Sequence, residues 1–209
     1  MTMKMLLGVG LGLLALLWVL GRIKSSESES SAAAVGTPSA TLDKWQISEK
    51  RSPMDDSKTV VLSLDADSSI HGPLGEKRPT LIVRCQQKKT QIYVVTGMAA
   101  TVEEDYDGGP SAGHKVGLRL DQSPARYETW GQSTDREALF AEESEYTRQN
   151  DTVYPSGQLV VLAKEMAKGK ALTFQFTPFD GSPQIATFDL HGLDSHIGKV
   201  AEACGWTID

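Results

Sequence analysis

Two adjacent carboxylates, Asp55 and Asp56, stand directly in front of an alternating apolar stretch in the segment SPMDDSKTVVLSLDA (52–66). Two carboxylates can divide acid and base roles between them, but only when both side chains face the same site. Adjacent side chains of an extended chain point to opposite faces, which argues against such a dyad. Because Asp side chains readily bond backbone N–H groups two residues further on, the pair is predicted to form a turn into the first strand. Either carboxylate would then be exposed as a contact for a partner.

The chain has two cysteines, Cys85 and Cys204, which are too few and too far apart for a zinc site. Cys85 lies in a strand-like apolar stretch and Cys204 on the apolar face of a helix-like one, so both are predicted to be buried. They are either two inert core thiols or a disulfide that joins the last helix to the sheet. The uncharged apolar run near the N-terminus (5–21) is typical of exported proteins, in which disulfides form, and this favours the disulfide. A bridge over so long a loop would stabilise the fold by about 4–5 kcal/mol in the chain-entropy model.

Other reactive residue types do not form a recognisable site. A phosphate-binding loop and a G-x-S-x-G nucleophile motif are both absent from the sequence. Asp105 and Asp107 resemble the start of a calcium loop, but the later ligands of that pattern are missing. The histidines lack the spacing of a metal pair on one helical face (His71, His114, His191 and His196). We therefore predict no catalytic residue, no metal ligand and no cofactor.

Several polar residues are better explained as surface contacts. Arg119 and Asp121 would point the same way from one strand, as an ion pair or as contacts for a partner. Trp130 is predicted to anchor the core, and Asp135 follows it in a polar stretch that a turn or a helix cap explains equally well. The candidate residues of a partner surface are Asp55, Asp56, Arg119, Asp121, Trp130 and Asp135.

Charge and composition limit the class of partner. The chain has 209 residues, 40% of them hydrophobic, with 27 acidic and 21 basic residues and a formal net charge of -6. This is the composition of a globular protein that is long enough to bury a core. An acidic chain without a dense Lys/Arg run is not expected to bind nucleic acid.

The N-terminus contains an uncharged apolar run, MLLGVGLGLLALLWVLG (5–21). A bilayer-spanning helix needs roughly 20 such residues, and the h-region of a signal peptide has about 7–15. Residues 1–24 are therefore predicted to be an uncleaved signal anchor, with a cleaved signal peptide as the alternative. Residues 25–43 are rich in Ser, Ala and Glu, which predicts a flexible tether. The folded domain is assigned to 44–209.

Alternation of apolar and polar residues predicts antiparallel strands, joined largely as hairpins. Residues 193–206 have the periodicity of an amphipathic helix that Gly205 ends, with Asp194 or Ser195 as its cap. A first helix is predicted over 156–169. The sequence thus predicts an α+β domain that is mainly antiparallel β, a small sandwich or curled sheet with two packed helices. The predicted strands cover 59–66, 80–86, 90–97, 114–121, 125–131, 137–143, 171–179 and 184–190.

Four stretches that cover most of 45–206 resemble, in the same order, the VasI (TagO) family of type VI secretion-associated proteins, which includes prophage-encoded relatives. They are WQISEKRSPMDDSKTVVLSLDA, LIVRCQQKKTQIYV, VGLRLDQSPARYETWGQSTDREALF and LTFQFTPFDGSPQIATFDLHGLDSHIGKVAEACGW. The most specific parts are the Ser-Pro-Met-Asp-Asp element, Arg84-Cys85, Arg119 to Asp121, Trp130 and the closing Ala-Cys-Gly-Trp.

The resemblance implies an exported, non-enzymatic accessory protein of the cell envelope whose domain is held by its cysteines. Its expected partners are envelope proteins of a secretion or phage-derived apparatus, with the cell wall as a further candidate. The apolar N-terminus predicts an inner-membrane anchor with the domain in the periplasm, or a soluble periplasmic protein after cleavage. The alternative function is an envelope hydrolase or inhibitor, based on the polar residues near Trp130 and the acidic loop.

Overall fold

The computed structural model describes residues 43–72, 75–102, 113–141 and 157–208. The chain divides into two units, residues 1–39 and 40–209, of which the first lies outside the described residues. The predicted anchor, nearly all of the tether, and Asp105 and Asp107 lie outside them as well. Across the described ranges, none of the helices has the length and apolar character needed to cross a membrane.

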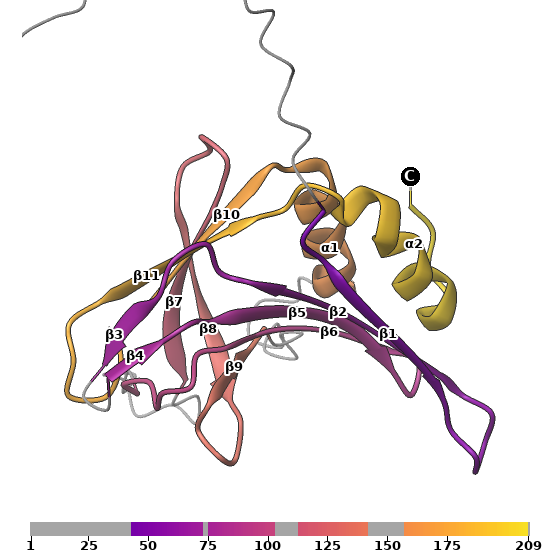
Figure 1. The fold of residues 1–209 in the computed structure, drawn as a ribbon, viewed down its shortest axis with the longest axis horizontal. Coiled ribbons are helices and arrows are strands. Elements are labelled where there is room, and N and C mark those ends of the chain that lie inside the picture. Colours follow the sequence, from indigo (N-terminus) through magenta and orange to yellow (C-terminus); the bar gives the residue numbers. More distant parts are fainter. Residues whose placement is uncertain (1–42, 73–74, 103–112, 142–156, 209) are drawn as a thin grey trace, which may run out of the picture. The chain divides into compact units, whose positions relative to one another are not determined.

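The described residues form strands followed by a helix, a hairpin and a second helix (Figure 1). In chain order the elements are β1 (Gln46–Arg51), β2 (Lys58–Asp65), β3 (Ile70–Gly72), β4 (Gly75–Lys77), β5 (Thr80–Gln86), β6 (Lys89–Val95), β7 (His114–Leu120), β8 (Arg126–Gln132), β9 (Ala138–Phe140), α1 (Gln158–Lys168), β10 (Ala171–Phe176), β11 (Gln184–Asp189) and α2 (Leu193–Cys204).

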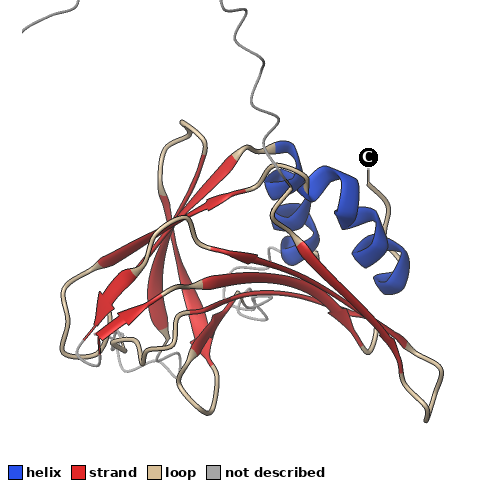
Figure 2. Cartoon of the chain, in the orientation of Figure 1, coloured by secondary structure: helices blue, strands red, loops and turns tan. Residues whose placement is uncertain are grey.

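Nine of these strands form one antiparallel sheet in the order β1-β2-β5-β6-β9-β8-β7-β10-β11, and β3 pairs with β4 separately. The sheet bends strongly, so that its two halves face each other (Figures 1 and 2). Backbone hydrogen bonds also join the halves directly. The Asp67 amide, just beyond β2, donates to the Thr187 carbonyl of β11 at 2.8 Å. The predicted α+β class, mainly antiparallel β with two helices, is confirmed.

The core fills the inside of the bend. Alternate side chains of each strand point into it, such as Val60, Leu62 and Leu64 of β2, which are at most 1% exposed. The Trp130 and Phe174 rings meet there with their centroids 5.3 Å apart. The two helices contact each other, α2 packs on β2, β5 and β6, and α1 packs on β6.

Three local predictions differ from the structure. Strand β1 was not expected, so the turn with Asp55 and Asp56 leads into the second strand rather than the first. Short strands β3 and β4 were also missed. Helix α2 starts after Gly192, which has φ 91°, and the structure records no side-chain cap, so the predicted cap by Asp194 or Ser195 is wrong. The predicted end at Gly205 is correct, because this residue adopts a left-handed conformation with φ 76°.

Candidate functional site

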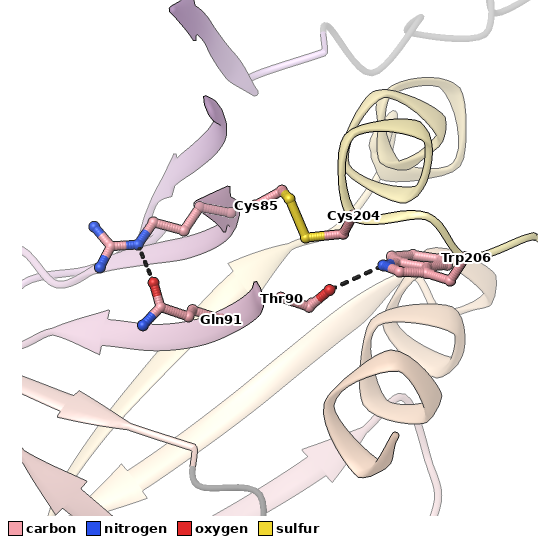
Figure 3. The surroundings of a disulfide bond; sticks show 6 residues. Cys85, Thr90, Gln91, Cys204 and Trp206 are labelled. Carbon is pink, nitrogen blue, oxygen red and sulfur yellow. Dashed lines mark hydrogen bonds between the residues drawn. A yellow bond between two sulfur atoms is a disulfide. The ribbon is translucent and has the colours of Figure 1, made fainter. Parts of the chain in front are cut away.

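The structure joins the two cysteines in a disulfide between β5 and the last turn of α2 (Figure 3). The Cα atoms of Cys85 and Cys204 lie 5.6 Å apart across a sequence separation of 119 residues. Cys85 is completely buried, whereas Cys204 is partly buried against the core. The disulfide thus fastens α2 covalently to β5, close to the β5–β6 turn.

A second contact holds the same end of α2. The indole N–H of Trp206 donates to the Thr90 hydroxyl at 2.9 Å, which connects the segment after α2 to the start of β6 (Figure 3). The Trp206 amide donates to the Ala201 carbonyl at 3.0 Å, so the chain turns back immediately after Gly205. We call the disulfide together with the Trp206–Thr90 hydrogen bond the C-terminal clamp of α2.

The start of α2 is held by charged groups instead. The Asp43 carboxylate is bonded to the His196 imidazole and also accepts the Trp45 amide at 3.0 Å. A Cβ atom at Gly192 would come within 2.6 Å of that carboxylate, so only glycine fits there. Burial raises the pKa of Asp43, but the bonds from His196 and Trp45 outweigh it and leave the pKa below its usual value.

Lys44 extends this charged group. Its ammonium lies 3.0 Å from Asp67 and 3.4 Å from Asp189, and the Asp189 carboxylate also bonds His191. The hydrogen bond with Asp67 is the largest of the effects that raise the pKa of Lys44. We call the contacts of Asp43 and Lys44 the N-terminal latch. The described residues contain no group of three or more His, Cys, Asp or Glu side chains suited to a metal ion.

The Asp55–Asp56 pair lies at the tip of the β1–β2 hairpin and shapes it. Asp55 Oδ1 accepts the Ser57 amide at 3.2 Å and the Ser57 hydroxyl at 2.8 Å. Hydrogen bonds from Ser52 and then Ser57 lower the pKa of Asp55. Asp56 has φ 54°, and its amide donates to the Ser52 carbonyl at 3.0 Å. The predicted turn is therefore present, and beside it Met54 is 91% exposed.

Arg119 and Asp121 have separate partners. Asp121 Oδ1 accepts the backbone amides of Lys170 and Ala171, both at 2.9 Å, which ties the β7–β8 turn to the connection between α1 and β10. The Arg119 guanidinium donates to the Ser123 carbonyl at 3.1 Å. In place of the suggested ion pair, Arg119 holds the β7–β8 turn itself and Asp121 joins this turn to the start of β10.

Trp130 lies in the core and is only 2% exposed. Its indole N–H donates to Glu128 Oε2 at 2.9 Å, and its ring packs on Phe174. The interpretation of this residue as a core anchor agrees with the structure, and a place on a partner surface does not, because its side chain is covered.

Asp135 belongs to the β8–β9 turn. Its Oδ1 atom accepts the Ser133 hydroxyl and the Glu137 amide, the latter at 3.1 Å. The Ser133 hydrogen bond is the main cause of its lowered pKa. The acidic candidates thus stand on three different hairpin turns, and the structure does not bring them together into one site.

A small hollow lies between β7, the β7–β8 turn, the start of β8, β10 and α1, and most of the residues that line it are apolar. Arg126 at this hollow is held by Glu128 and Glu165, each at 2.9 Å. The polar side chains at the hollow are the Arg126 guanidinium, engaged by these two carboxylates, and the Ser123 hydroxyl. Its lining is Leu118, Leu120, Ser123, Pro124, Arg126, Leu162 and Leu172.

Sequence reasoning missed two exposed features. One is strand β1, whose six residues are all exposed at the end of the strand order. The other is Tyr127 of β8, which is 62% exposed on the outside of the sheet. The sequence carries no local signal for either feature, because both depend on how the strands pair in the folded sheet.

A comparison with protein-family models, curated proteins and solved structures finds no match for this chain. The resemblance to the VasI family therefore stays a prediction from the quoted stretches.

Proposed function

We propose that this chain is a non-enzymatic accessory protein of the cell envelope that acts through protein–protein contacts. Its apparatus would be a type VI secretion system or a related phage-derived machine. The N-terminal segment would anchor it in the inner membrane and present the domain in the periplasm.

The β1–β2 hairpin is the observation that carries this proposal. Strand β1 ends the strand order with all six residues exposed, and the hairpin extends beyond the other strands in Figure 1. Its tip presents Met54, which is 91% exposed. An edge strand offers backbone donors and acceptors to a further strand, which is a common way for proteins to bind an extended partner segment.

The hairpin has a defined shape, which reduces the entropy lost on binding. At its tip Asp55 fixes the turn through Ser57. Within its strands Glu49 bonds Lys58 at 3.1 Å and Lys199 of α2 at 2.8 Å. The C-terminal clamp then connects α2 to β5. A contact made at the tip would therefore meet a preformed surface.

The disulfide supports the proposed location. Structural disulfides persist in oxidising compartments such as the bacterial periplasm and are rare in the cytosol. A buried cysteine such as Cys85 in such a bond is consistent with a stable, exported domain.

Site-specific photo-crosslinking tests the proposal in the organism that carries the gene. A photo-reactive residue at position 54 is expected to capture an envelope component of the apparatus. The matched control is position 161 on α1, where Val161 is also exposed, at 55%. In parallel, Met54→Glu is expected to impair assembly or secretion, and Val161→Glu is not.

Two outcomes would contradict the proposal. One is an identical set of adducts from positions 54 and 161. The other is full function of the apparatus with Met54→Glu, when the amount of folded, oxidised protein equals that of the wild type.

A further inference from the structure

The nine-stranded sheet has two edges, which the chain treats differently. At β11 the segment that follows β2 meets the edge strand: the Asp67 amide donates to the Thr187 carbonyl at 2.8 Å, and the His71 amide donates to Gln184 Oε1 at 3.0 Å. Strand β1 forms the other edge, and among the described residues only β2 bonds its backbone. The amides and carbonyls on the far side of β1 are therefore open to a further strand.

The side chains of β1 alternate between the two sides of the sheet. Ile47, which pairs with the fully buried Leu62, points to the core side. Glu49 and Arg51 follow at intervals of two and share that side, whereas Lys50 lies between them and points to the outer side. Ile47 is 38% exposed, so it presents apolar surface at the rim of the core.

The charge along this edge is positive. Lys50 and Arg51 are exposed, and neither side chain has an ion-pair or hydrogen-bond partner among the described residues. The carboxylate of the strand, Glu49, is already bonded to two cations, Lys58 at 3.1 Å and Lys199 at 2.8 Å. The nearest carboxylates in sequence lie outside the strand, in the hairpin tip and in the N-terminal latch. Charge complementarity along β1 therefore favours an acidic partner.

An added strand has defined positions opposite β1. The described strands of the sheet all pair antiparallel, so an antiparallel strand continues the same pattern. Two consecutive residues of that strand would stand opposite Arg51 and Lys50, where carboxylates gain opposite-charge pairs on both sides of the sheet. Four residues after the first of them, opposite Ile47, an aliphatic residue would extend the apolar rim. The pattern that fits this edge is acidic-acidic-x-x-aliphatic.

A second copy of β1 fits the same edge less well. When two copies pair antiparallel about a two-fold axis perpendicular to the sheet, one residue stands opposite itself. A pairing centred on Glu49 or on Lys50 places like charges opposite each other, which is unfavourable. A pairing centred on Ser48 places neither of the two free cations opposite a carboxylate. The charges of β1 therefore favour a different chain as the occupant.

We propose that the open edge of β1 binds an extended acidic segment of the partner protein, which adds to the sheet as an antiparallel strand of the form acidic-acidic-x-x-aliphatic. Its carboxylates pair with Lys50 and Arg51, and its aliphatic residue packs beside Ile47. This inference rests on the proposed function and deepens it, because it names the chemistry of the segment that the β1–β2 hairpin meets.

Nuclear magnetic resonance of the isotope-labelled full chain in detergent tests the inference with three synthetic peptides. TEETTVT has the expected pattern, TKKTTVT reverses its charges, and TEEPPVT keeps the acids but contains prolines that prevent strand pairing. Titration with TEETTVT is expected to shift the amide signals of β1 and to slow their hydrogen exchange. The other two peptides are expected to bind more weakly by about fivefold.

Reversing the charges of the edge should reverse the preference. The double variant Lys50→Glu and Arg51→Glu is expected to bind TKKTTVT more tightly than TEETTVT by about fivefold. The matched control is Lys88→Glu with Lys89→Glu, which makes the same charge change at the exposed β5–β6 turn and should leave the preference for TEETTVT intact. Circular dichroism and resistance to thiol labelling verify that each variant is folded and oxidised.

Four results would overturn the inference. They are equal binding of TEETTVT and TEEPPVT, equal binding of the acidic and basic peptides, no shift of the β1 amides, and loss of the preference in the control variant. A dimer in analytical ultracentrifugation, with the β1 amides protected in the absence of peptide, would also overturn it and assign the edge to a second copy. Crosslinking at position 54 does not require an acidic segment, so its success combined with failure of the peptides would remove this inference and leave the proposed function in place.

Discussion

The two ends of α2 are held by different chemistry, the last turn on strand β5 and the first turns on the chain just before β1. The C-terminal clamp is a disulfide to β5 supported by the Trp206–Thr90 hydrogen bond. The N-terminal latch consists of the Asp43–His196 contact and the Lys44 ion pairs. A disulfide responds to reductant but not to salt, whereas partly exposed ion pairs respond to pH and salt but not to reductant. One helix therefore carries two attachments that can be weakened independently.

The two attachments also differ in strength. Closing a loop of about 120 residues stabilises a fold by roughly 4–5 kcal/mol in the chain-entropy model. Exposed ion pairs contribute only about 0–1 kcal/mol each. The Asp43 side chain is 42% exposed, so its contact belongs to the weaker class. We expect the C-terminal clamp to make the larger contribution to the free energy of unfolding. The N-terminal latch should mainly position the chain segment that leads into β1.

The largest effect is expected from removing the disulfide. The double variant Cys85→Ala and Cys204→Ala should lower the free energy of unfolding by about 4–5 kcal/mol, because its unfolded chain regains loop entropy. Urea denaturation followed by circular dichroism measures this change. Reductant should destabilise the wild type by a similar amount and leave the double variant unchanged. An unaltered urea midpoint would show that the bond does not stabilise the fold.

A smaller effect is expected within the same clamp from Trp206→Phe. This change keeps an aromatic ring but removes the indole N–H that donates to Thr90. The loss should be about 1 kcal/mol, the usual net contribution of one hydrogen bond. Combining it with Thr90→Val in a double-mutant cycle isolates the contact. Strictly additive losses would mean that the hydrogen bond has no stabilising effect.

The smallest effect is expected at the N-terminal latch, and it should depend on pH. Because the folded-state pKa of Asp43 lies below its ordinary value of 3.8, its contribution is present above that pH. It is lost as the pH falls through the folded-state pKa. Asp43→Asn should therefore reduce the free energy of unfolding at pH 6 by less than about 1 kcal/mol. The wild type and variant should converge at the acid limit.

Urea titrations of the two proteins between pH 2 and pH 6 measure this difference, and added salt should reduce it. A difference that stays constant down to the lowest pH would contradict the assignment of the effect to the Asp43 carboxylate. The variant His196→Gln removes the imidazole that bonds Asp43 and so tests the same contact from its other partner.

The sequence was most informative where one side of an element is buried. The helix periodicity that ends at Gly205 and the alternation of β2 led to correct elements, because burial leaves a repeating apolar pattern. Strand β1 has no buried residue, so QISEKR carries no such pattern. Its assignment depends on pairing with β2, which only the folded structure shows.

Pairings between distant strands were also beyond the reach of the sequence. Adjacent strands suggest hairpins, but β6 pairs with β9, where the Tyr93 and Phe140 rings stack at 4.4 Å. For the candidate site, two cysteines on apolar faces left two buried thiols or a disulfide open, and the apolar run near the N-terminus favoured the disulfide, which the structure contains. Asp43 and His196 are 153 residues apart, and Asp43 stood in the predicted tether, so their contact had no local signal.

The separation of the cysteines has a consequence for biogenesis. A chain exported N-terminus first would expose Cys85 to an oxidase well before Cys204 emerges, 119 residues later. With two cysteines in the sequence, a single chain has just one internal pairing available. Oxidation would then need no isomerase to correct it, and the competing error would be a crosslink between two emerging copies.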